Sequence, residues 1–283
     1  MGRLDFILSK MKRTAPRMKV LVLCDGLGCF SKMSKQMGHD VRALDILPMD
    51  HIDLPMDLMN FRPEMLPGWV PDFIEISVPC ETFSGITHMK GGGNLYYESL
   101  YSYSKKGRKQ HVIGIKPRTN FTIDKRLLKR NKVKIKAKQE QHLALVIKAI
   151  EIIKYYQSVN PNLVWVIENP ASGYIRYIIN QYITDCFENK TTYCMYGSEF
   201  RKETSFFSNK QFDLKYCPKH KDGVTDLCGG HTDGFVQRYD NKAQAKGVVK
   251  KSSYLERSSI PSKLCMEILN QYQKDFVLIF RTV

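Results

Sequence analysis

Short apolar runs, separated by segments of helical spacing, dominate most of the chain. The runs predict strands at 19–23, 41–44, 73–77, 163–167 and 205–208. Over 140–157, apolar residues recur three and four positions apart, which predicts a helix that Asn160 and Pro161 end. Strands separated by helices form parallel sheets whose two faces are both covered. The pattern therefore predicts an α/β fold with a doubly wound, mostly parallel sheet.

Weaker patterns extend this prediction toward the carboxyl terminus. Helical spacing predicts further helices at 175–187 and 262–273, and apolar runs predict further strands at 192–196 and 276–280. None of the apolar runs approaches the roughly 20 residues that cross a bilayer, so we expect no membrane partner.

The composition changes at residue 209. From there to about residue 253, Gly, Asp, Lys, Cys and His dominate, which indicates a small irregular module. A chain of 283 residues can bury one substantial core and carry such a module beside it. We expect a main domain built from 1–208 and 254–283, with 209–253 as the module.

The charge of the chain favours a polyanionic partner, because 44 Lys and Arg against 28 Asp and Glu give a formal net charge of +16. The excess is concentrated in 105–138, which contains fourteen basic residues and one acid, Asp124. A solvated loop could have the same basic composition, but this run lies between two motifs that contain candidate catalytic residues. We expect 85–138 to be a basic loop that contacts phosphates. Its leading basic residues are Lys105, Lys106, Arg108 and Lys109.

The first 18 residues lack the long apolar segment of a secretory signal, which predicts an intracellular protein, in the nucleus or the cytoplasm. Eight cysteines are too sparse for a disulfide scaffold and are expected to stay reduced. Each is then a small core residue, a metal ligand or a nucleophile.

A glycine turn after the first strand has the features of a cofactor site. Asp25, Gly26, Leu27 and Gly28 follow the strand and precede helical spacing, and Asp45 ends the next strand. Glycines let a backbone turn tightly and approach a ligand, while an acid at the end of the next strand can accept from ribose hydroxyls. Any strand-to-helix turn can use two glycines. Together with the acid they favour a cofactor that contains adenosine.

Two further strand ends carry a thiol and a carboxyl group. Cys80 stands behind Pro79 after a strand, where nearby positive charge or a helix terminus could hold it as a thiolate. A buried, inert cysteine is the alternative, and the adjacent basic segment counts against it. Glu168 follows five apolar residues and precedes Asn169 and Pro170, where it could hold or donate a proton. The thiol and the carboxyl could face one pocket.

In their order along the chain, these motifs resemble those of the cytosine-5 DNA methyltransferase family, in particular its short viral and phage-like members. PCETFS at 79–84 is similar to the nucleophile motif Pro-Cys-x-x-Phe-Ser, and ENP at 168–170 to the Glu-Asn motif that binds the base. GLG at 26–28 resembles the first cofactor motif, and RSSIP at 257–261 the closing motif.

The resemblance implies a Rossmann-like, S-adenosylmethionine-dependent methyltransferase that acts on cytosine in DNA and releases S-adenosylhomocysteine. Cys80 would add to carbon 6, and Glu168, with Asn169 beside it, would bind the cytosine edge. The base must leave the duplex stack to be reached. Asp45 would bind the cofactor ribose and Asp57 the adenine. The full set of expected cofactor residues is Asp25, Gly26, Leu27, Gly28, Asp45, Ile46, Asp57, Leu58 and Pro79.

The chain departs from the family pattern in places. Glu81 stands where the family usually has Gln, and no Gln-x-Arg-x-Arg stretch follows the Glu-Asn motif. The arginine that should touch the base is therefore unassigned, and Arg201 or Lys202 could replace it. We also expect Ser84 to contact nucleic acid.

The irregular module contains two Cys-x-x-His pairs, formed by Cys217 with His220 and by Cys228 with His231. These ligands suit a tetrahedral structural zinc, or they are unliganded polar loop residues. The module lies where the family carries its target-recognition segment, so it could read DNA.

Three functions remain open from the sequence. The first is a DNA cytosine-5 methyltransferase, which we expect to be a monomer with DNA as its partner. The second keeps the chemistry and moves the substrate to RNA, since a tRNA-methylating branch uses a similar site. The third is a nucleic-acid-binding, methyltransferase-like protein with weak or lost turnover.

Overall fold

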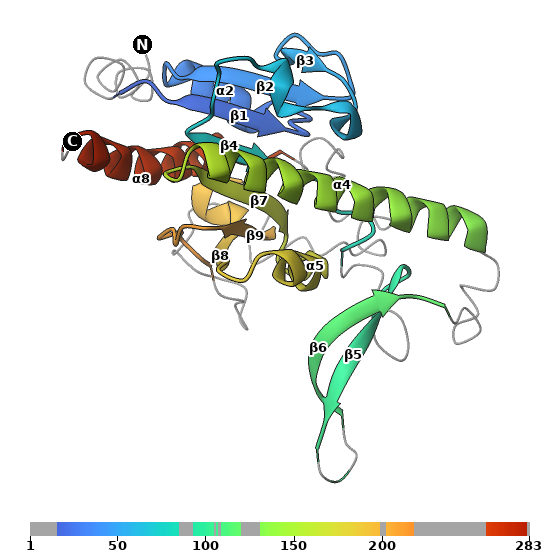
Figure 1. Cartoon of the computed structure of the whole chain (residues 1–283). Helices are drawn as coiled ribbons and strands as arrows, with labels where there is room; N and C mark the ends of the chain where they lie inside the picture. Colours follow the sequence, from blue (N-terminus) through green and yellow to red (C-terminus); the bar gives the residue numbers. More distant parts are fainter. Residues whose placement is uncertain are drawn as a thin grey trace, which may run out of the picture.

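The computed structural model of the chain describes residues 16–84, 93–104, 106, 109–119, 131–198, 202–217 and 259–281. The strands of its main sheet are β1 (Lys19–Leu23), β2 (Asp40–Asp45), β3 (Leu54–Pro55), β4 (Phe73–Ile76), β7 (Val164–Pro170), β8 (Phe187–Thr192) and β9 (Glu203–Ser208). They form one seven-stranded sheet in the order β3-β2-β1-β4-β7-β9-β8 (Figure 1).

The sheet is mostly parallel, as the alternation of patterns predicts. β1 pairs in parallel with β2 and β4, β2 with β3, and β4 with β7. Only β9 runs the other way, between β7 and β8. The carboxyl ends of β1, β2, β4 and β7 therefore lie at one edge of the sheet.

Helices cover both faces of the sheet, so the predicted doubly wound architecture is confirmed. The helices are α2 (Cys29–Gln36), α4 (Lys132–Val159), α5 (Ile175–Tyr182) and α8 (Ser262–Arg281), with 3-10 turns η1 (Leu58–Asn60), η2 (Pro63–Met65) and η4 (Tyr193–Tyr196). On one face, Ile74 packs with Ile150 of α4 in a core that α5 also enters. On the other, Phe73 packs with Phe30 of α2 and Tyr272 of α8.

A separate antiparallel hairpin follows the nucleophile motif. Its strands are β5 (Tyr97–Tyr103) and β6 (Lys109–Pro117), and it extends away from the body of the molecule in Figure 1. At its base, Tyr97 and Ile115 belong to the core beneath α4 and α5, and the hydroxyl of Tyr177 donates to the carbonyl of Val112 at 3.4 Å. The hairpin is thus an arm with a packed root.

Three sequence predictions need correction. The predicted strand at 276–280 is the end of α8, where Phe276 packs on Tyr272; a short apolar run does not by itself distinguish a strand from a buried helix. The predicted strand at 192–196 is mainly the turn η4, with β8 before it. The expected loop at 85–138 contains the hairpin and the first turns of α4, which begins early because Asn131 caps it by accepting from two backbone amides.

Among the described residues, no helix is both long and apolar enough to cross a membrane.

Candidate active site

The predicted site residues converge because they follow parallel neighbouring strands. The turn at 25–28 follows β1, Asp45 ends β2, Cys80 follows β4, and Glu168 lies near the end of β7. These strand ends share one edge of the sheet (Figure 1). Ligands of open α/β sheets bind beyond this edge, so the arrangement forms a candidate site.

The glycine turn is fixed by the carboxylate of Asp45. Gly26 and Gly28 have φ values of 50° and 76°, in the left-handed region that glycine adopts without strain. The amide of Gly26 donates to Oδ2 of Asp45 at 2.9 Å, and the amide of Leu47 donates to Oδ1 at 2.9 Å. Asp45 therefore ties the end of β2 to the turn after β1. Its binding of ribose hydroxyls stays a prediction.

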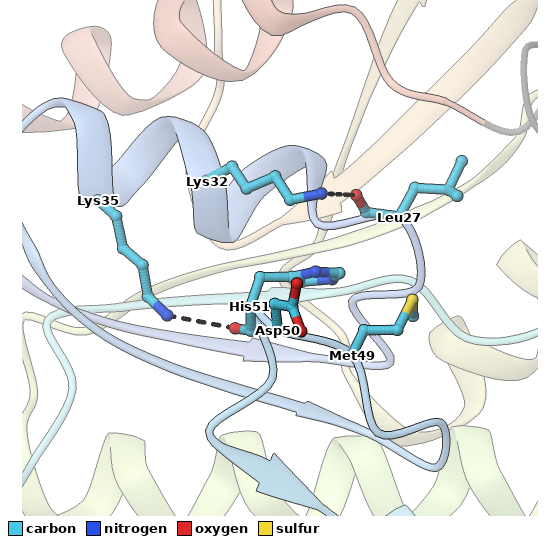
Figure 2. A pocket seen from close by; sticks show the side chains of 6 residues that line it. All are labelled: Leu27, Lys32, Lys35, Met49, Asp50 and His51. Atoms are coloured by element: carbon cyan, nitrogen blue, oxygen red, sulfur yellow. Dashed lines mark hydrogen bonds between the residues drawn. The ribbon is translucent and has the colours of Figure 1, made fainter.

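His51 braces the same turn and was not found from the sequence. Its Nε2 lies 3.1 Å from the carbonyl oxygen of Gly26 and 3.6 Å from Oδ2 of Asp25. A Cβ atom on Gly28 would lie 2.6 Å from Cδ2 of the imidazole ring, so glycine is needed there for space as well as for φ. Figure 2 shows this histidine at a hollow of about 460 Å³, lined by Leu27, Lys32, Lys35, Met49, Asp50 and His51.

The remaining predicted cofactor residues differ in their exposure and in their hydrogen bonds. Asp25 is 8% exposed, burial raises the pKa of its carboxyl, and its Oδ2 has no hydrogen-bond partner among the described residues. Asp57 caps η1, since its Oδ1 accepts from the amide of Met59 at 2.9 Å. Leu58 is buried, whereas Ile46 is 66% exposed at the edge of the sheet. The turn thus offers one buried polar acceptor, and Ile46 offers an apolar surface.

The nucleophile motif forms a tight turn. The carbonyl of Cys80 accepts from the amides of Phe83 at 3.0 Å and Ser84 at 2.8 Å. Pro79 is exposed, the thiol is half-buried, and Phe83 is fully buried beneath it in the core. The turn therefore anchors the cysteine at the end of β4.

Opposed charges act on the thiol. Burial raises the pKa of Cys80 above its usual value, and the carboxylate of Glu168 raises it further. The ammonium of Lys202 lowers it. The thiol, a carboxylate and an ammonium group thus share one site, although they come from three separate parts of the chain.

Glu168 is held by two groups that lie far along the sequence. The carboxylate is 7% exposed, and its Oε1 accepts from the hydroxyl of Tyr193 at 3.1 Å and from Nζ of Lys202 at 3.5 Å. Nζ of Lys202 also lies 4.7 Å from the centre of the Tyr193 ring. Of the two replacements considered for the missing arginine, Lys202 lies at the site, because β9 runs beside β7; Arg201 is outside the described residues. Tyr193 was missed because no local motif marks it.

Asn169 connects the two chemical strand ends. It is fully buried, and its Nδ2 donates to the carbonyl of Val78 at 3.5 Å, two residues before Cys80. Its Oδ1 is buried without a hydrogen-bond partner in the described part of the chain. Asn169 therefore positions the nucleophile strand and leaves a buried acceptor.

Only some of the residues predicted to contact nucleic acid lie in the described part of the chain. Lys106 is exposed at the tip of the hairpin and Lys109 begins β6, whereas Ser84 is 6% exposed. Lys105 and Arg108 lie outside the described residues. The roles of all five stay predictions.

The predicted zinc site has no support in the described residues. Cys217 is fully buried, and its amide donates to Oγ1 of Thr192 at 2.8 Å. His220, Cys228 and His231 lie outside the described residues. Within the ranges that are described, no three His, Cys, Asp or Glu side chains gather as a metal site would require.

The strand order, the single reversed strand β9 and the helices on both faces define a Rossmann-like, doubly wound α/β fold. Comparisons with solved structures find DNMT2 of Spodoptera frugiperda, solved as a triple mutant, at 14% identity and a TM-score of 0.38, covering 73% of this chain and 57% of that one. They also find the Dnmt2 methyltransferase of S. pombe at 12% identity and a TM-score of 0.40, covering 70% of this chain and 53% of that one. The chain therefore spans somewhat over half the length of each.

No family model and no curated protein matches the chain. Both TM-scores are below 0.5, so the fold assignment depends on the strand order and not on these two similarities.

Proposed function

We propose that the chain transfers a methyl group from S-adenosylmethionine to carbon 5 of cytosine in DNA. The observation that carries this proposal is that Cys80, Glu168 and Lys202 lie at the carboxyl edge of the sheet. There Lys202 donates to Glu168, and the neighbouring Asn169 donates to Val78, two residues before Cys80. A nucleophile beside a carboxylate and a cation suits addition to a ring whose nitrogen gains charge.

The residues at the glycine turn fit the cofactor. The left-handed turn at Gly26 and Gly28 brings backbone close to the edge. The buried Oδ2 of Asp25 makes no hydrogen bond within the described residues and lies 3.6 Å from Nε2 of His51, so it can accept from a cationic amino group. Asp45 and Asp57 would hold the adenosine part, with Ile46 against the adenine. When bound, the cofactor supplies an electrophilic methyl group on a sulfonium.

The chain's own residues would make the cytosine reactive. The thiolate of Cys80 adds to carbon 6, which turns carbon 5 into a nucleophile able to take the methyl group. Glu168 binds the cytosine edge and donates a proton to the ring nitrogen that gains negative charge, and Tyr193 and Lys202 hold its side chain in place. After carbon 5 has taken the methyl group, its proton is lost to water, the double bond between carbons 5 and 6 re-forms, and Cys80 leaves as a thiolate.

The hairpin would supply the surface for nucleic acid. It carries exposed Lys106 and Lys116 beside the exposed side chains of Leu100, Tyr103 and Ile113. Basic groups contact phosphates, and aromatic rings stack on unpaired bases. The arm also follows the nucleophile turn directly in the sequence, which suits a role in holding a flipped nucleotide.

Trapping with 5-fluorocytosine oligonucleotides tests the chemistry. With cofactor present, the wild-type chain should form a covalent adduct that the Cys80→Ser variant does not form. Absence of an adduct on several sequences would favour a nucleic-acid-binding protein without turnover.

Labelled cofactor then separates the two substrates. The proposal expects label in duplex DNA, and bisulfite sequencing of DNA from expressing cells would give the sequence context. Label in tRNA and none in DNA would move the activity to RNA.

A further inference from the structure

A buried amide lies behind the nucleophile turn. Asn94 is fully buried, and its Nδ2 donates to the carbonyl of Thr82 at 2.8 Å and to that of Ser84 at 3.0 Å. Its Oδ1 accepts from the amides of Tyr96 and Tyr97, both at 2.8 Å. Two donors and two accepted bonds use the full capacity of the side chain. One residue therefore joins the turn after Cys80 to the start of the hairpin.

The hairpin's second strand completes this connection. The Arg118 side chain is buried; its Nε donates to the carbonyl of Asn94 at 2.8 Å, and its Nη2 to that of Tyr97 at 3.3 Å. Glu98 lies 3.9 Å from the same guanidinium. A fixed, planar fork of donors suits such a multiple contact better than a flexible ammonium does. Arg118, directly after β6, thus holds the backbone of Asn94, three residues before β5.

Just before Asn94, the backbone at Gly93 lies very close to the first residues of β5. Gly93 has φ of 83°, and a Cβ atom on it would lie 2.1 Å from the carbonyl oxygen of Tyr97. The ring of Tyr97 stacks on Phe83 of the nucleophile turn, with centroids 5.7 Å apart. The root of the hairpin and the nucleophile turn are therefore packed as one unit.

Contacts from other elements hold the outer side of the turn. His142 of α4 lies 3.3 Å from the hydroxyl of Thr82, and Lys138 pairs with Glu81 at 2.5 Å. The amide of Tyr174 donates to the carbonyl of Phe83 at 2.7 Å. These bonds reach the turn from α4 and from before α5, whereas the Asn94 amide ties it to the hairpin.

We propose that Asn94 is a positioning residue for Cys80, and that Asn94 and Arg118 fasten the nucleic-acid-binding arm to the nucleophile turn. The catalytic part of this inference rests on the proposed function. Buried carbonyls that lose their donor are costly, so the turn needs this amide to keep its shape. A displacement of the arm on binding nucleic acid would therefore be transmitted to Cys80 through the hydrogen bonds of Asn94 and Arg118.

Asn94→Asp tests the proposal, because aspartate has nearly the same shape but turns both donors toward Thr82 and Ser84 into acceptors. We expect the amides of Phe83 and Ser84, which donate to Cys80, to exchange with deuterium about tenfold faster. Alkylation of Cys80 by iodoacetamide, read by peptide mass spectrometry, should also become about tenfold faster as the thiol loses burial. Methyl transfer should fall by about tenfold or more, with cofactor affinity unchanged.

Asn189→Asp is the matched control. Asn189 is also a buried amide that donates to two carbonyls, those of Phe206 and Lys210, and accepts from the amide of Phe212. It lies on β8, away from the nucleophile turn. Its variant should lose thermal stability to a similar degree, and should leave amide exchange at 82–84 and Cys80 alkylation as in the wild type.

Arg118→Lys decides the question if Asn94→Asp does not fold, since the lysine keeps a charge near Glu98 and loses the fork to two carbonyls. Faster exchange at Phe83 and Ser84 supports the proposal. Exchange and alkylation at wild-type rates in the folded variants overturn it. If the wild-type chain transfers no methyl group while these changes still appear, the proposed function fails and the fastening of the turn stands.

Discussion

Charges of opposite sign act on Cys80, and this sets a testable dependence on pH. Its pKa is raised by burial and by Glu168, and lowered by Lys202. In Lys202→Met the pKa of Cys80 should rise, because the positive charge that lowers it is removed. The thiolate fraction at pH 8 then falls. Alkylation of Cys80 by iodoacetamide should slow by about threefold to tenfold, with its pH profile displaced to higher pH.

Glu168→Gln is the opposing control for the same measurement. Removal of the carboxylate lowers the pKa of Cys80, so alkylation should become faster while methyl transfer falls by about 100-fold. A purely structural role for Glu168 would not give opposite changes in these two rates. Slower alkylation in this variant would contradict the electrostatic account of the site.

Gly28 is constrained by both its conformation and its neighbour. At φ of 76°, and with the imidazole of His51 2.6 Å from an added Cβ, Gly28→Ala must displace either the turn or the ring. We expect cofactor affinity, measured by calorimetry, to fall by about tenfold, at a cost of about 1–3 kcal/mol in strain. Gly68→Ala is the control, since it has φ of 69° and open space around it. Equal affinities in the two variants would mean that the turn does not hold the cofactor.

At the residue scale, sequence reasoning reached the groups that follow strands and missed the groups that support them. Cys80, Glu168 and Asp45 could be found because a strand end places each at one edge. His51, Tyr193 and Asn94 could not, because their partners depend on which distant segments pack together. Tyr193, for example, meets Glu168 only because β9 inserts beside β7.

At the scale of elements, the parallel strands were predicted closely and the hairpin was not. After Lys19, β1 is entirely apolar because both faces of the sheet are covered, so this strand is easily recognised in the sequence. β5 and β6 lie outside the main sheet, the register of their pairing shifts twice, and their apolar and polar residues alternate poorly. The basic composition of 85–138 suggested a loop, while pairing between the strands decided the structure.

The exposed aromatic ring of the hairpin gives a prediction for that element. Tyr103 is 60% exposed on an arm that is rich in lysine. Stacking on a base is worth about 1–3 kcal/mol, so Tyr103→Ala should weaken binding to single-stranded oligonucleotides by about fivefold to 100-fold in fluorescence anisotropy. Lys106→Gln should lower the slope of log affinity against log salt by about one.

Phe187→Ala provides the control for the ring, since Phe187 is 47% exposed at the start of the edge strand β8. It should bind like the wild type. If the Tyr103 and Phe187 variants lose affinity equally, the hairpin is not the binding surface.

At the scale of the whole molecule, a buried acid in the central strand β4 links stability to pH. Glu75 is 1% exposed, and its Oε1 accepts from the hydroxyl of Ser77 at 2.6 Å. Burial raises its pKa well above the usual value, and the carboxylates of Asp25 and Glu168 raise it further. The folded chain therefore keeps this acid protonated at a pH where the unfolded chain ionises it.

The sign of the effect follows from this difference. Because the pKa of Glu75 is higher in the folded chain, its contribution to stability is fully present below its pKa in the unfolded chain, near 4.5. This contribution is lost as the pH rises toward its pKa in the folded chain. Glu75→Gln keeps a neutral side chain of the same shape, so it should be more stable than the wild type at pH 8 and nearly equal to it at pH 5. The gain is about 1.4 kcal/mol for each pH unit within that window. Urea unfolding at pH 5, 6.5 and 8 measures it, with exposed Glu64→Gln as the control. Parallel stability curves for Glu75→Gln and the wild type would mean that Glu75 is ionised in the folded chain, which would place an uncompensated charge beneath the proposed cofactor site.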